Sequence, residues 1–138
     1  MNLIRIKARL KPAYLAALED HDEFFIVRLK GDLDTPALEL NRDKMTAIIE
    51  GVNLYSKPVL CDFGGVKHTD TATLAALIQR ISEFKKHGGQ KMVFFNVRGD
   101  LLSLFEIAHL AHFFEIRGTQ QEAQFALASF KCNIGESV

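Results

Sequence analysis

Long hydrophobic runs and a surplus of charge of one sign are both missing from this sequence. No apolar run approaches the roughly 18 residues that a membrane-spanning helix needs, and the N-terminus lacks the hydrophobic region of a signal peptide. Lysine plus arginine equal aspartate plus glutamate at 17 each, which argues against a nucleic-acid-binding surface. We therefore expect a cytoplasmic protein that neither inserts directly into a membrane nor binds nucleic acid.

Cysteine is also scarce, since only Cys61 and Cys132 are present in the 138 residues. The two lie far apart, and Cys61 falls in a predicted buried strand, so we expect reduced thiols and no disulfide. A chain of this length forms one domain with a substantial core. No internal repeat or low-complexity segment is visible.

The most informative stretch begins after Pro58, where an apolar run predicts the buried strand Val59–Phe63. Gly64–Thr69 is predicted to be a loop. Apolar residues then recur with the spacing of one buried helix face, at Leu74, Leu77, Ile78 and Ile81. Lys85, Lys86 and His87 before Gly88-Gly89 indicate the end of that helix.

The start of this helix holds the candidate site. Asp70 is a good N-cap, because its carboxylate can accept backbone N–H groups one turn further on. Thr71 then falls at the first helical position, with its hydroxyl at the positive end of the helix dipole. A phosphate on Thr71 would be accommodated there, next to the Asp70 carboxylate.

Strand and helix patterns alternate along most of the chain. Strands are predicted at residues 3–7, 24–29, 92–97 and 113–116, a turn at 31–34, and a short helix at 12–18. One long amphipathic helix is expected after Thr35, the predicted N-cap, with Leu38, Met45, Ile49 and Val52 on one face. Further helices begin at Gly99-Asp100 and at the capping box Thr119-x-x-Glu122.

These elements predict an α/β fold in a single domain. The sheet is expected to be mixed but mostly parallel, with about five strands and about four helices. The first two strands should be antiparallel, because no helix clearly long enough connects them.

Catalytic arrangements find little support. Gly64-Gly65 lacks the Gly-Lys-Ser/Thr ending of a P-loop and is interpreted as a turn, and Asp62 lacks the acidic cluster that a phosphoaspartate site needs. His109 and His112 have the spacing of a metal pair but no further ligand by spacing. The serines stand in no nucleophile-elbow context. We therefore expect no enzymatic activity, no metal and no cofactor.

Three motifs, taken together with their order along the chain, resemble the STAS domain family. This family includes bacterial anti-sigma factor antagonists and the cytosolic domains of sulphate transporters. The three motifs are the run Asp62-Phe63-Gly64-Gly65-Val66 followed by Asp70-Thr71, the segment Leu29–Thr35, and the strand Gln90–Val97. The resemblance covers roughly Glu23 to Phe130. It implies a STAS-like domain at 24–130, with an N-terminal strand and an insertion at 1–23 as part of the same domain. We expect residues 131–138 to form a flexible tail.

The resemblance implies a signal-transduction function through protein–protein interaction. An anti-sigma factor or serine-kinase-like partner would bind the domain and be released when Thr71 is phosphorylated. The predicted partner-binding residues around Thr71 are Asp34, His68, Thr69, Asp70, Ala72 and Thr73. The alternative is a docking subunit of a stress-signalling scaffold or a lipid-transport ABC assembly that works without phosphorylation. Pairing into a homodimer also stays open.

Overall fold

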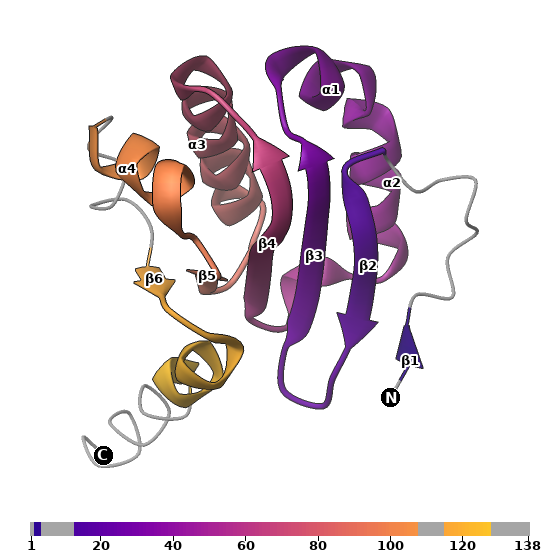
Figure 1. The fold of residues 1–138 in the computed structure, drawn as a ribbon. Helices are drawn as coiled ribbons and strands as arrows, with labels where there is room; N and C mark the ends of the chain where they lie inside the picture. The colour runs from indigo at the N-terminus through magenta and orange to yellow at the C-terminus, as the bar shows by residue number, and fades with distance from the viewer. Residues whose placement is uncertain (1, 4–12, 108–114, 128–138) are drawn as a thin grey trace.

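The computed structural model describes residues 2–3, 13–107 and 115–127, and in this part of the chain six strands form one sheet (Figure 1). The strands follow one another in space as they do in sequence: β1 Asn2–Leu3, β2 Leu15–Asp20, β3 Phe25–Asp32, β4 Val59–His68, β5 Met92–Phe95 and β6 Glu115–Arg117. The pairs β1–β2 and β2–β3 are antiparallel, and β3 to β6 pair in parallel. The α/β class and the mixed, mostly parallel sheet are confirmed.

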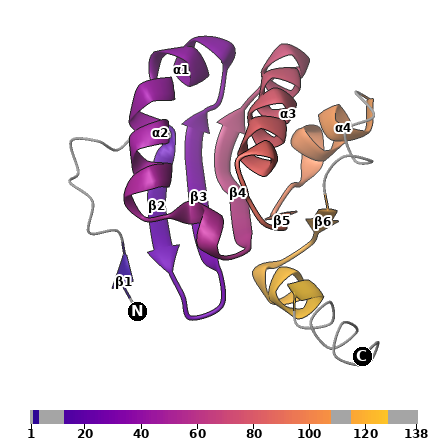
Figure 2. The same cartoon turned by 180° about the vertical axis from the view of Figure 1, so that it is seen from behind.

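Helices connect the parallel strands. They are α1 Thr35–Leu40, α2 Arg42–Gly51, the short 3-10 helix η2 Leu54–Ser56, α3 Thr71–Lys86 and α4 Gly99–Ile107. Residues 120–127 are also helical, and we call them the final helical segment. The helices α1, α2 and α3 lie behind the strands in Figure 1 and in front of them in Figure 2, so all three cover the same face of the sheet.

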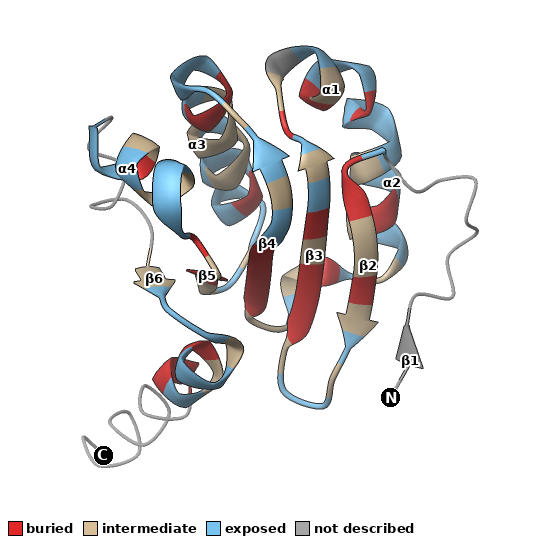
Figure 3. Ribbon diagram, in the orientation of Figure 1, coloured by how far each residue is buried: buried red, intermediate tan, exposed pale blue. Residues whose placement is uncertain are grey.

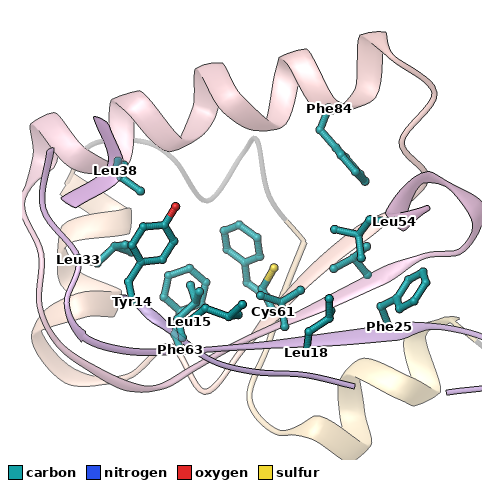
Figure 4. Packing of buried hydrophobic residues seen from close by; sticks show 14 of the residues in the cluster. Tyr14, Leu15, Leu18, Phe25, Leu33, Leu38, Leu54, Cys61, Phe63 and Phe84 are labelled. Atoms are coloured by element: carbon teal, nitrogen blue, oxygen red, sulfur yellow. The ribbon is translucent and has the colours of Figure 1, made fainter. Parts of the chain in front are cut away.

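The main core lies between this face and its helices (Figure 4). The rings of Phe63, Phe94 and Phe105 contact one another, with centroids 4.9–6.0 Å apart. Leu74 of α3 is completely buried against them in the same cluster. Burial of each such side chain contributes about 1.5–3 kcal/mol, so this core supplies most of the stabilisation of the fold.

The opposite face of the sheet has a smaller core. Its strand residues are fully buried and come from three neighbouring strands: Ile26, Leu60, Val93 and Phe95. The final helical segment covers them with Ala123 and Leu127.

The predicted helix at residues 12–18 is wrong, because residues from Leu15 onward form strand β2. Leu15 and Leu18 are buried in the main core, and Leu18 lies opposite Val27 of β3. The alanine-rich sequence favours a helix locally, but pairing with β3 and burial of these two leucines override that preference.

The predicted turn at 31–34 and the predicted loop Gly64–Thr69 both start too early, because β3 and β4 continue as a parallel pair to Asp32 and His68. Between the pairs Arg28↔Asp62 and Asp32↔His68, β4 has two more residues than β3, in two register shifts. Gly65 is required at the first shift, since a Cβ there would stand 2.6 Å from the carbonyl oxygen of Leu29. The glycine pair thus allows a close approach of two strands.

The predicted single helix after Thr35 is divided at Asn41 into α1 and α2. Asn41 is buried, and its Nδ2 donates to the Ala37 carbonyl oxygen over 2.8 Å. The N-cap is also one residue earlier than predicted. Asp34 has extended backbone angles, and its carboxylate accepts from the Ala37 N–H over 2.9 Å, so Asp34 and not Thr35 caps α1.

Other predictions are confirmed or lie outside the described residues. β5, α4 and the capping box are present, with Glu122 N donating to Thr119 Oγ1 over 3.1 Å and Thr119 N donating to Glu122 Oε1 over 3.2 Å. The first strand is described at Asn2–Leu3 only. The histidine pair, the start of the last strand, Cys132 and the tail fall within 108–114 and 128–138, which the structure does not describe.

Candidate functional site

The start of α3 has the predicted geometry. Asp70 has extended backbone angles and is the N-cap, and its carboxylate accepts from the Thr73 N–H over 2.7 Å. Hydrogen bonds from the Thr73 hydroxyl and from the Thr73 backbone N–H lower the pKa of Asp70, even though this side chain is almost fully solvated. The carboxylate is therefore ionised at neutral pH and fixed at the beginning of the helix.

Thr71 is the first residue of α3, and it is exposed, as is Ala72. Thr73, in contrast, is 0% exposed. Its hydroxyl serves the cap, so its side chain cannot belong to a contact surface. We therefore remove Thr73 from the predicted partner-binding residues and assign it to the support of Asp70.

The start of α1 lies beside the start of α3. Asp32 and His68 are register partners in β3 and β4, and Leu33 N donates to the His68 carbonyl oxygen over 2.9 Å. The caps Asp34 and Asp70 each follow two residues after this pair, and α1 contacts α3. The structure thus brings Asp34 to the same end of the sheet as the Thr71 site, as the sequence predicted.

This end of the sheet is largely exposed, as the pale tip of β4 in Figure 3 shows. His68 is exposed at the end of β4. Thr69 is partly exposed, but its Oγ1 atom is buried and has no hydrogen-bond partner among the described residues. His68, Thr69, Asp70 and Ala72 therefore lie in one partly or fully exposed stretch of chain around Thr71, with one unsatisfied hydroxyl beneath it, and Asp34 lies at the same end of the sheet.

Sequence reasoning missed a polar cluster on the opposite face of the sheet, which we call the Arg28 network. Arg28 Nη1 donates to Asp62 Oδ2 over 2.7 Å, and Arg28 Nε donates to Glu19 Oε2 over 2.7 Å. Arg28 Nη2 donates to Gln120 Oε1 over 3.0 Å. The hydrogen bonds to Glu19 and Asp62 and the charges of these two carboxylates raise the pKa of Arg28, and Arg28 lowers the pKa of Glu19.

Asp62 joins this network to the strand end that leads toward α3. Its Oδ1 accepts from the Gly64 N–H over 2.8 Å and from Asn96 Nδ2 over 2.9 Å. Asp62 is thus held by three donors and is not available as a phosphoacceptor. An arginine and an aspartate inside otherwise apolar strands were the only signal in the sequence, and their pairing across 34 residues could not be read from it.

Among residues 2–3, 13–107 and 115–127, no three or more His, Cys, Asp and Glu side chains are grouped so that they could hold a metal ion. Cys61 is buried, and desolvation raises the pKa of its thiol to about 12, so the reactive thiolate is suppressed.

The sequence model of the STAS domain matches residues 16–123. The chain belongs to the STAS domain family. The match begins inside β2, so this strand lies within the part of the chain that the family model covers. No curated protein matches the chain.

The solved structures that match this fold include proteins described as anti-sigma factor antagonists. A putative antagonist from Thermotoga maritima has a TM-score of 0.66 at 14% identity, and the match covers 79% of this chain and 91% of that one. An anti-sigma-factor antagonist (STAS) domain protein from Planctomyces limnophilus gives 0.62 at 18% identity, covering 80% and 96%. The antagonist SpoIIAA in its unphosphorylated form gives 0.53 at 21% identity, covering 81% and 96%.

These likenesses establish the STAS fold over about four-fifths of the chain. The family is generally non-enzymatic and acts through protein–protein interaction. Within the described residues, no helix combines the length and the apolar character needed to cross a membrane.

Proposed function

We propose that this domain is a non-enzymatic regulator that binds a protein partner at the start of α3 and releases it when Thr71 is phosphorylated. The observation that carries the proposal is the exposed Thr71 hydroxyl, held at the first helical position by the Asp70 cap in a STAS domain. The partner is of the anti-sigma factor or serine-kinase type and adds the phosphate itself. The proposed place of action is the bacterial cytoplasm.

The proposed contact surface consists of the exposed residues around the start of α3. Thr71 and Ala72 are exposed on the first turn, and His68 and Asp70 precede them on the surface. Asp34 extends this surface to the start of α1. A partner that covers these residues excludes water from them, so the electrostatic interactions among them become stronger on binding.

The electrostatics of the site support a switch of binding and not of folding. A phosphate on Thr71 adds about −1.5 to −2 charges. The positive end of α3 stabilises this charge by about 0.3–1 kcal/mol, and solvent screens its repulsion from Asp70 in the free protein. In a docked, desolvated interface the same repulsion costs several kcal/mol, because like charges are then poorly screened. The fold should therefore persist while the complex dissociates.

The test is affinity capture from the native cell lysate with mass spectrometry that also reports phosphorylation at Thr71. Wild type is compared with Thr71→Asp and with Ser82→Asp, which adds the same charge at an exposed position on the same helix. We expect a kinase-like partner to be captured by wild type and by Ser82→Asp but not by Thr71→Asp. Equal capture of a scaffold or transporter subunit by all three, with Thr71 unmodified, would replace this proposal by the phosphorylation-independent docking function.

A further inference from the structure

The Arg28 network links two parts of the molecule that are far apart in the sequence. Gln120, at the beginning of the final helical segment, accepts from Arg28, and Arg28 also binds Asp62. Asp62 accepts in turn from the Gly64 N–H, at the first register shift on β4. A continuous chain of hydrogen bonds therefore runs from the final helical segment to the part of β4 that leads to α3.

Within residues 120–127, the final helical segment buries only small or few apolar side chains. Its buried apolar residues are Ala123, Ala126 and Leu127, whereas Phe125 is 71% exposed. Within the described residues, a direct side-chain hydrogen bond between Gln120 and Arg28 ties the segment to the sheet. An anchor of this kind, with a charged donor, matters more where the apolar contacts are small.

Docking of the segment also protects the ion pairs. The side chain of Arg28 is 29% exposed and that of Asp62 is 12% exposed. When the segment detaches, Arg28 loses a hydrogen bond and gains access to water. The higher effective dielectric then weakens its attraction for Asp62, and Asp62 is held less firmly against Gly64 and Asn96.

We propose that docking of the final helical segment and the conformation of β4 at Gly64 form one cooperative unit, coupled through Arg28 and Asp62. Gln120 is the positioning residue that keeps the final helical segment docked on the sheet in this unit. Because coupling is reciprocal, a molecule that binds the exposed end of β4 and the start of α3 changes the docking equilibrium of the segment. Displacement of the segment likewise changes the conformation of β4 at Gly64. The coupling is a property of the free chain and does not depend on the proposed partner or on phosphorylation.

Hydrogen exchange of the full chain, followed amide by amide by NMR, tests this coupling. Gln120→Ala removes the acceptor of Arg28, and Gln124→Ala is the matched control, because Gln124 bonds to Gln120 and not to Arg28. Loss of a hydrogen bond from a charged donor should raise exchange in the final helical segment about tenfold. In one cooperative unit the Gly64 amide should rise by the same factor, while α2 on the other face stays unchanged as an internal reference.

A rise confined to residues 120–127, or no rise in either place, would overturn the proposal. Equal effects of Gln120→Ala and Gln124→Ala would also overturn it, since Arg28 would then not carry the coupling. Arg28→Lys provides an independent check, because it keeps the cation but loses the fork that reaches two partners at once. We expect this variant to raise exchange at Gly64 and in the final helical segment together, and a rise at only one of them contradicts the coupling.

Discussion

The Arg28 network and the start of α3 are both rich in polar groups, yet they use them in opposite ways. In the network, Arg28 and Asp62 are mostly buried, and each is held by partners from several elements. At the start of α3, Thr71 is exposed, and the hydroxyl of Thr69 has no partner among the described residues. The polar groups of the network bind one another within the fold, whereas the α3 start exposes Thr71 at the surface and leaves one buried hydroxyl unsatisfied.

The largest effect that distinguishes the two regions should come from Arg28→Met. This change keeps much of the volume of the side chain but leaves Glu19 and Asp62 without their cation. Loss of one partner from a buried ion pair costs about 3 kcal/mol, which chemical denaturation would detect as a lower free energy of unfolding. The double variant Arg28→Met/Asp62→Leu should recover part of this loss, and a loss that is simply additive would mean that the pair is not the cause.

The pH dependence of stability should follow the Arg28–Glu19 ion pair of the same network. Arg28 lowers the pKa of Glu19 in the folded protein, so the stabilisation is present above the unfolded-state pKa of Glu19 and is lost as the pH falls through the folded-state pKa. Wild type should thus lose stability on acidification below about pH 4.5 more steeply than Arg28→Met does. Denaturation midpoints measured from pH 7 to 3 check this, and parallel curves for the two proteins would contradict it.

A smaller effect is expected at the cap of α3. Asp70→Ala removes the acceptor of the Thr73 N–H and should destabilise the protein by about 1 kcal/mol. Asp70→Asn keeps a capping acceptor without the charge and should cost only a few tenths of this. Thermal or chemical unfolding compares the two, and an equal loss in both would show that charge, not the hydrogen bond, is what matters at this position.

The smallest effect concerns the unsatisfied hydroxyl of Thr69. Thr69→Val replaces the buried Oγ1 by a methyl group of similar shape and should stabilise the free domain by up to about 1 kcal/mol. Chemical denaturation measures the gain. A destabilised variant would show that this hydroxyl is satisfied within the folded chain, and the contrast with the Arg28 network would then be weaker.

The parts of the fold that were predictable from the sequence have strong local signals. Asp70, Thr71 and the apolar spacing from Leu74 onward define α3 within one segment, and the capping box at Thr119 does the same for the final helical segment. Where the prediction failed, distant pairing decided the structure. Strand β2 exists because it pairs with β3, and β4 continues past Gly64 for the same reason.

The same distinction between local signals and distant contacts applies to the candidate site. Its helix start follows from a local motif, and the approach of Asp34 follows from the parallel order of β3 and β4. The burial of Thr73 could not be read from the motif, because it depends on which side of the first turn faces the core. The Arg28 network was invisible for a similar reason, since its members come from four elements and meet only after the sheet has formed.

The central claim is that phosphorylation at Thr71 acts on an interface and not on the fold. The direct measurement is titration calorimetry of the captured partner against the domain with Thr71 unmodified and with Thr71 phosphorylated, each checked by chemical denaturation. The account predicts that affinity falls about 100-fold or more, because the phosphate adds like charge beside Asp70 in a desolvated contact, while the free energy of unfolding changes by less than about 1 kcal/mol. Equal affinity of the two forms, or a phosphorylated domain that unfolds, would contradict it.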